Sequence, residues 1–84
     1  SREWTLGDVK FVTTELPEEH RVYPGQRGVN AATAMGHLEL VKFVTTELPE
    51  KHRVYPEQSA VNKAVRNGHL EVVKFVTTEL PRRY

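Results

Sequence analysis

Histidine side chains recur at fixed spacing along this chain, and imidazole is the commonest metal ligand among protein side chains. They form two pairs whose members lie 32 residues apart, His20 with His52 and His37 with His69. Zinc requires three or four ligands within about 2.0–2.3 Å of the metal, whereas stacked helices lie about 8–10 Å apart. The spacing therefore predicts no metal site.

Three glutamates, Glu15, Glu47 and Glu79, share the same spacing. Paired carboxylates can supply the acid and the base of glycoside hydrolysis, and a separation of about 8–10 Å is close to that of an inverting enzyme. These residues are, however, expected on the polar side of a helix end, with no apolar pocket around them. The chain also lacks a nucleophile elbow and a cysteine, and Gly25 and Gly28 form only a lone G-x-x-G. We predict no catalytic residue, no cofactor and no enzyme activity.

Charge and hydropathy exclude two further classes of partner. The 84 residues include 12 Lys and Arg against 11 Asp and Glu, and acidic residues stand beside His20-Arg21 and His52-Arg53. Because nucleic-acid binding needs several cations that are not neutralised, no nucleic-acid partner is expected. Apolar runs of two or three residues at most predict no membrane partner and no signal peptide. The lack of cysteine excludes a disulfide scaffold and, with no signal peptide, favours an intracellular location.

An internal repeat determines where these side chains are placed. The segment 11–17 recurs unchanged at 43–49 and 75–81, so the period is 32 residues. Residues 4–35 match residues 36–67 at 20 of 32 positions. A fixed period of this size is typical of a solenoid, in which each unit buries its apolar face against its neighbours.

A long helix is predicted in each unit, over 70–80, 38–48 and about 5–16. It ends before a proline, because the residue preceding proline is driven out of the α-helical region. Thr5-x-x-Asp8 is typical of a capping box at the start of the first copy. The apolar stripe of the third copy is expected to consist of Leu70, Val73, either Val76 or Thr77, and Leu80, widened by Val72 and Phe75.

A short helix is predicted over 60–66 and 28–34. Ser59 is expected to be its N-cap, and Asn67-Gly68 its left-handed stop. Its apolar face is expected to contain Val61, Ala64 and Val65, with Ala64 allowing a close helix approach. Only a short turn separates this helix from the long one, which predicts an antiparallel hairpin.

We therefore expect one all-α domain over residues 1–84, consisting of a partial repeat, 1–26, and two repeats, 27–58 and 59–84. The first unit has no short helix. In addition, Asp8 stands where the later copies have Leu40 and Val72. The ends of the stack are therefore expected to expose faces where neighbouring units would pack, with Trp4 covering part of the gap. Two interpretations stay open: both ends are modest polar caps, or these units belong to a longer array.

The segment Asn67-Gly-His-Leu-Glu-Val-Val-Lys-Phe75, preceded by Ala64-Val-Arg, resembles the ankyrin repeat, whose period is 33 residues. The resemblance implies an ankyrin-like solenoid in which His37 and His69 brace the turns. The tetratricopeptide repeat is the alternative, but its 34-residue period and its Trp-x2-Leu-Gly motif fit poorly. In place of the ankyrin β-hairpin finger the chain has the proline-bounded segment 49–58, so the loops between repeats are expected to be irregular.

The resemblance implies a non-catalytic scaffold that binds partner proteins on the side formed by the short helices and the loops. Carried over by position, the residues on that side are Arg21, Tyr23, Arg27, Asn30, Arg53, Tyr55, Ser59, Asn62, Lys63 and Arg66. Arg and Tyr often anchor interfaces, although the two tyrosines could equally pack beneath the loops.

The alternative function is a structural repeat module without a natural ligand, which contacts copies of itself through its exposed ends. Identities between units extend to positions expected on the surface, such as Thr13-Thr14-Glu15 and His20-Arg21. Packing does not demand these identities, and recent duplication or engineering would explain them.

Overall fold

The chain folds into helices in a computed structural model that describes residues 4–80, and this part of it contains no strand. The prediction of an all-α fold is confirmed. The long helices are α1 (Leu6–Lys10) with its continuation Phe11–Glu15, α3 (Leu38–Lys42) with its continuation Phe43–Glu47, and α5 (Leu70–Thr78). The short helices are α2 (Gln26–Ala34) and α4 (Gln58–Arg66). Two 3-10 turns, Glu18–His20 and Glu50–His52, begin the loops between repeats, which are irregular as predicted.

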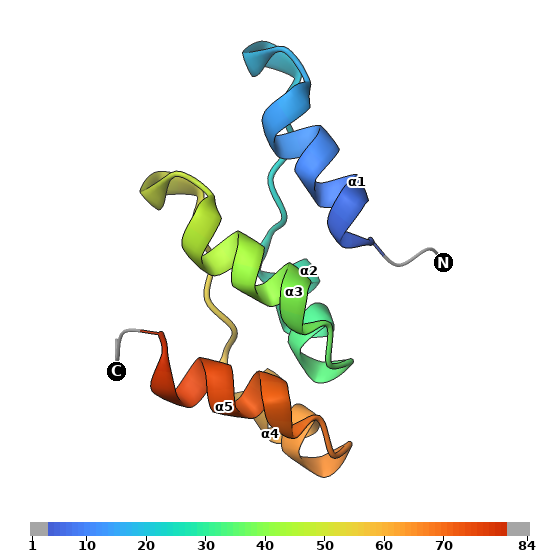
Figure 1. The fold of residues 1–84 in the computed structure, drawn as a ribbon, viewed down its shortest axis with the longest axis vertical. Helices are drawn as coiled ribbons and strands as arrows, with labels where there is room; N and C mark the ends of the chain where they lie inside the picture. The colour runs from blue at the N-terminus through green and yellow to red at the C-terminus, as the bar shows by residue number, and fades with distance from the viewer. Residues whose placement is uncertain (1–3, 81–84) are drawn as a thin grey trace.

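The helices form two layers, and both layers follow the 32-residue period (Figure 1). One layer consists of the long helices, in which α1 and α5 both pack against α3. The other consists of the short helices, in which α2 packs against α4. Each short helix also packs against the long helix that follows it, α2 against α3 and α4 against α5. The molecule measures 38 × 29 × 17 Å.

The core lies between the two layers. It contains Val9 of α1, Val29 and Ala32 of α2, and the buried side of α3 and its continuation, namely Leu40, Val41, Phe43, Val44 and Leu48. Ala60 and Ala64 of α4 are also buried, and α4 packs against both α2 and α5. Between residues 4 and 80, no helix is both long and apolar enough to cross a membrane.

The short helices begin earlier than predicted. Helix α4 starts at Gln58, its N-cap is Glu57 in extended conformation, and the Glu57 carbonyl accepts hydrogen bonds from Ala60 and Val61. The prediction that Ser59 is the N-cap is therefore wrong, since Ser59 lies inside the first turn. Pro56 keeps Tyr55 out of the α-helical region, Glu57 is also extended, and the helix begins at the next residue.

The helix stops are as predicted, because both are left-handed glycines. Gly36 has φ +79° and Gly68 has φ +78°, a conformation that only glycine adopts without strain. A Cβ atom on Gly36 would lie 2.5 Å from Nδ1 of His69. The histidine of the third unit thus packs against the turn of the second, at a position where no side chain fits.

Two expectations about the apolar faces are wrong, and both concern the last unit. Leu70 is 63% exposed, and the buried centre of α5 is Val72, at 1%. Val65 is 51% exposed, whereas its counterpart Thr33 in α2 is fully buried. Thr33 is covered because α4 follows α2, but no described helix follows α4 or α5. The periodicity gives the helical face correctly, while the position in the stack decides how much of it is covered.

Candidate functional site

The two loop arginines of the predicted surface are hydrogen bonded to the chain's own carbonyls. Arg21 donates from Nε to the Leu16 carbonyl (2.9 Å) and from a terminal nitrogen to the Thr14 carbonyl (3.3 Å). Arg53 makes the same two bonds one period later, to Leu48 (2.7 Å) and Thr46 (3.0 Å). A helix end leaves its last carbonyls without partners, and the guanidinium groups supply the missing donors. Their recurrence therefore has a structural cause.

The loop tyrosines are also held by neighbouring units. The ring of Tyr23 stacks on that of His52 at a centroid distance of 3.7 Å and an interplanar angle of 3°. Tyr55 is half-buried, and its backbone carbonyl accepts a hydrogen bond from Nε2 of Gln26 (2.8 Å). These contacts join one repeat to the next. The alternative in which the tyrosines pack beneath the loops describes Tyr23 better than a free binding role.

Several repeated positions that were expected on the surface are likewise structural. Thr13 and Thr45 are buried, and their hydroxyls donate to the carbonyls of Val9 (2.6 Å) and Val41 (2.7 Å). The expectation that packing makes no demand on this position is wrong, because the side chain lies in the interior and bonds the helix backbone.

Asn30 belongs to the contact between the short helices. Its Nδ2 donates to Oε1 of Glu57 (2.9 Å), and its Oδ1 accepts a hydrogen bond from the Glu57 amide (3.0 Å). Its counterpart Asn62 is exposed and, among the residues that the structure describes, its side chain bonds only within its own helix, where its Oδ1 accepts from Nε2 of Gln58 (3.0 Å). The same residue type therefore joins two units in α2 and faces solvent in α4.

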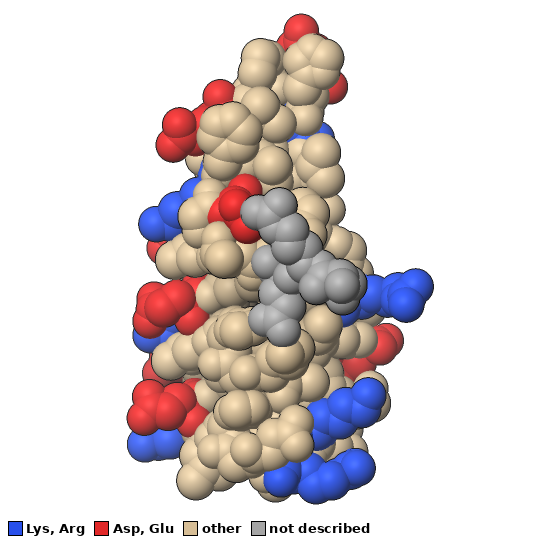
Figure 2. Space-filling model, turned by 90° about the vertical axis from the view of Figure 1, so that its right-hand side faces the viewer, with Lys and Arg blue, Asp and Glu red and all other residues tan. Residues whose placement is uncertain are grey.

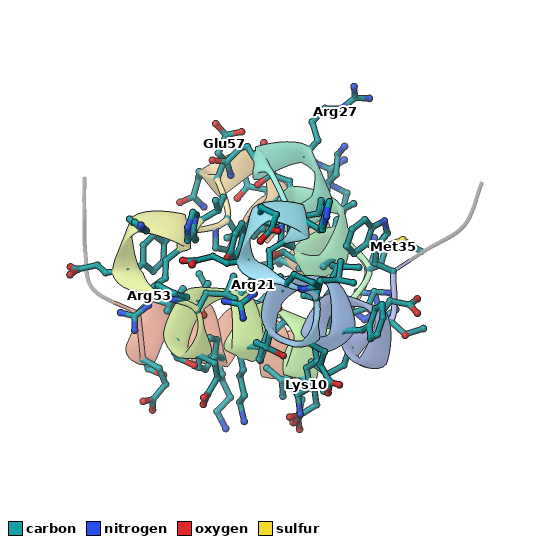
Figure 3. All side chains as sticks on the ribbon, turned by 90° about the horizontal axis from the view of Figure 1, so that it is seen from above. Lys10, Arg21, Arg27, Met35, Arg53 and Glu57 are labelled. Atoms are coloured by element: carbon teal, nitrogen blue, oxygen red, sulfur yellow. The ribbon has the colours of Figure 1, made fainter. Side chains whose placement is uncertain are left out.

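The remaining predicted residues lie together on the solvent side of the short helices. Figure 3 shows Arg27 extending away from the long helices, with Lys10 on the opposite side of the molecule. Arg27, Lys63 and Arg66 are exposed, and within residues 4–80 their charged groups make no hydrogen bond or ion pair. We refer to the exposed positions of this side as the short-helix face: Arg27, Ser59, Asn62, Lys63 and Arg66.

Charge is distributed unequally between the two layers. The short helices and their N-caps carry three basic residues, Arg27, Lys63 and Arg66, against the single acidic residue Glu57. The long helices and their continuations, counted with Glu79 at the C-cap of α5, carry six acidic residues, two in each unit, against three lysines. Figure 2 shows the result: basic groups predominate along the right-hand edge of the view, and acidic and basic groups alternate along the left-hand edge. This asymmetry does not appear when charge is summed along the chain, and it becomes visible only when charge is counted by helix layer.

Groups suited to metal binding or acid–base chemistry are dispersed. No three His, Asp or Glu residues in the described part of the chain are placed to hold a metal ion. His52 stacks on Tyr23, and His69 packs against Gly36. The repeated glutamates Glu15, Glu47 and Glu79 are all exposed.

A cavity of about 480 Å³ lies beside α1, on the side where the other long helices have a short helix. Its lining is mostly apolar and includes Trp4, Val9, Ala32, Met35, Leu40 and Val44. The sequence predicted an exposed end, because the first unit has no short helix. It did not indicate that α1, α2 and α3 would leave a defined cavity there.

Comparison with known proteins adds no relative, since no family model, curated protein or solved structure matches this chain.

Proposed function

We propose that this protein is a non-catalytic scaffold of the ankyrin-like type, which binds an acidic segment of a partner protein through the short-helix face. The ankyrin-like part of the proposal is supported by the 32-residue period, by antiparallel helix pairs packed in two layers, and by the Gly-His turn that joins each pair.

The observation that carries the proposal is a set of three exposed cations on one face of the short helices, Arg27, Lys63 and Arg66, whose charged groups have no partner among residues 4–80. Lys63 and Arg66 are three residues apart in α4 and therefore lie on the same side of it. Arginine in particular binds carboxylates in a fixed, two-pronged geometry. The acidic layer on the other side would orient the molecule as an acidic partner approaches.

A protein segment fits this face better than nucleic acid does. The positive charge is confined to three side chains, and it is interrupted by Glu57 and by the uncharged Ser59 and Asn62. Phosphate backbones require a broad field from several neighbouring cations. A mixture of hydroxyl, amide and cationic groups instead suits a peptide that offers carboxylates and backbone carbonyls together.

The proposal is tested with two double variants of equal charge. Lys63→Ala with Arg66→Ala removes two cations from the short-helix face, and Lys51→Ala with Lys74→Ala removes two exposed cations elsewhere. The probe is a fluorescent hexaglutamate peptide, titrated at several salt concentrations and compared with single-stranded DNA. We expect the first variant to weaken peptide binding by about tenfold or more, since each lost charged contact contributes about 1.5–3 kcal/mol at best. The second variant should bind like the parent.

Two results would contradict the proposal. Equal weakening by both variants would show that net charge alone attracts the peptide. Tighter binding to DNA than to the peptide, with a steep salt dependence, would assign the face to nucleic acid.

A further inference from the structure

Within residues 4–80, helix α1 has no short helix packed beside it, unlike the other long helices. Helix α3 has α2, and α5 has α4, whereas the corresponding place beside α1 is the cavity of about 480 Å³. The cavity wall is made by Val9 of α1, by Gly28, Ala32 and Met35 of α2, and by Leu40 and Val44 of α3. This cavity is therefore an apolar site of the kind that the short helices occupy in the other repeats. We call it the seat.

The repeat contains an occupied copy of this seat one period later, where the occupant is α2. Helix α2 packs on α4, in which Ala60 and Ala64 are buried. Two side chains of α2 hold it in register with the backbone that leads into α4. Gln26 donates to the carbonyl of Tyr55 (2.8 Å), and the amide of Glu57 donates to Asn30 (3.0 Å).

The same two backbone groups stand beside the cavity without partners. One period before Tyr55 and Glu57 are Tyr23 and Gly25, both of which line the cavity. Within residues 4–80, the Tyr23 carbonyl accepts no hydrogen bond and the Gly25 amide donates none. The counterpart of the covered Ala60 is Gly28, which is exposed. Both the apolar and the polar parts of the seat are thus present and unused.

From this we infer that the cavity binds a short amphipathic helix of a partner protein, in the orientation in which α2 binds α4. The bound helix would carry Gln and Asn four residues apart, to reach the Tyr23 carbonyl and the Gly25 amide. On the same face it would carry small or β-branched residues, as α2 does with Thr33. This inference is independent of the short-helix face, which lies on α2 and α4 and engages charge.

A second copy of the chain does not fit the seat while both copies remain folded. Helix α4 carries the required pattern, with Gln58, Asn62 and the exposed Val65 on its free side. However, α4 is packed against α5. If α4 occupied the cavity of another copy as α2 occupies its own seat, α5 would need the place that α1 already fills. A helix without an attached long helix avoids this overlap.

The probe for the test is a synthetic peptide with the sequence of residues 23–37, added to the full chain. The protein has a single tryptophan, Trp4, which lines the cavity and is half-exposed, and the peptide has none. Tryptophan emission therefore reports on the cavity alone. We expect a saturable blue shift, in the high-micromolar range because so short a helix must be ordered on binding. A peptide in which the positions of Gln26 and Asn30 are alanine should bind about tenfold more weakly, since it lacks both hydrogen bonds.

Two substitutions of Gly28 supply the matched control. Gly28→Ala reproduces the residue found at Ala60 and should leave peptide binding unchanged or tighter. Gly28→Gln places a longer side chain in the seat and should weaken binding by at least about tenfold. Both changes are compatible with folding, because Gly28 is exposed, has only Pro24 near its Cβ position (3.9 Å) and lies within a helix that glycine disfavours. Far-UV circular dichroism confirms that each variant is folded.

Three results would overturn the inference. The first is the absence of a saturable change in tryptophan emission with the parent protein. The second is equal binding by the folded Gly28→Ala and Gly28→Gln variants, which would place the peptide elsewhere. The third is a dimer in sedimentation that Gly28→Gln dissociates, without peptide binding, which would assign the cavity to a second copy. None of these results bears on the hexaglutamate experiment.

Discussion

Arg53 shows how a residue type that is common at interfaces can instead serve the fold. Its guanidinium group donates to the carbonyls of Leu48 and Thr46, at the end of the long helix of the same unit. By its position in the repeat Arg53 was expected on the binding surface, because a sequence pattern gives the residue type but not the hydrogen-bond partner. Lys63 and Arg66, assigned on the same grounds, remain exposed. The difference lies in where each residue stands relative to its helix end: Arg53 lies in the loop after the long helix and donates back to its last carbonyls, whereas Lys63 and Arg66 lie within the last turn of α4 and are exposed.

We expect Arg53→Ala to lower the free energy of unfolding by about 1.5–3 kcal/mol, the usual range for hydrogen bonds to a charged group. The matched variant Arg66→Ala removes an arginine that makes no such bond and should change stability by no more than about 0.5 kcal/mol. Urea unfolding followed by circular dichroism measures both. Equal destabilisation by the two variants would mean that Arg53 is not a helix cap.

The turns between the two helices of a unit also have the same residue in different surroundings. Both turns contain a left-handed glycine, but only Gly36 has the histidine of the next unit against it. At Gly68 nothing lies within 4 Å of the Cβ position. The two glycines have nearly equal φ, so a comparison of their substitutions separates backbone strain from contact between units.

Gly68→Ala should cost about 1–2 kcal/mol, because it places a side chain in the left-handed region. Gly36→Ala should cost at least about 1 kcal/mol more, because the His69 ring must also move. Thermal or urea unfolding of the two variants provides the comparison. If the two costs are the same, His69 does not bind the second turn to the third unit.

Helix positions were predictable from the sequence because prolines, glycines and the period all mark their boundaries. The predicted 38–48 and 70–80 agree closely with α3 and its continuation and with α5. The π-helical form of Phe11–Glu15 and Phe43–Glu47 was not predictable. It depends on the helix end, where the Leu16 amide bonds to the Phe11 carbonyl five residues earlier (3.2 Å). The local backbone geometry decides whether such a bond forms, and the helix propensities of the residues do not predict it.

At the scale of the whole molecule, each unit contacts and covers side chains of the unit next to it. The ammonium group of Lys10 lies 5.9 Å from the ring centre of Phe43, and Lys42 lies at the same distance from Phe75. Phe43 is 9% exposed, whereas Phe11, in the first unit, is 52% exposed. This arrangement accounts for three features of the molecule. They are the exposed charged residues on α2 and α4, the cavity beside α1, and the outer sides of α4 and α5, which no described helix covers. The sequence predicted the exposed ends, but which contacts they lack became clear only by comparing equivalent positions in the structure.

The central claim is that 32-residue helix pairs are stabilised by packing on one another, and lengthening the stack tests it most directly. A second copy of residues 27–58 is inserted after Gln58, and a glycine–serine segment of the same length serves as the control. The additional α2–α4 and α3–α5 contacts should raise the melting temperature by at least about 5 °C, which corresponds to roughly 1 kcal/mol for a domain of this size, within a single cooperative transition. A melting temperature no higher than that of the control, or a separate transition for the added unit, would contradict the claim.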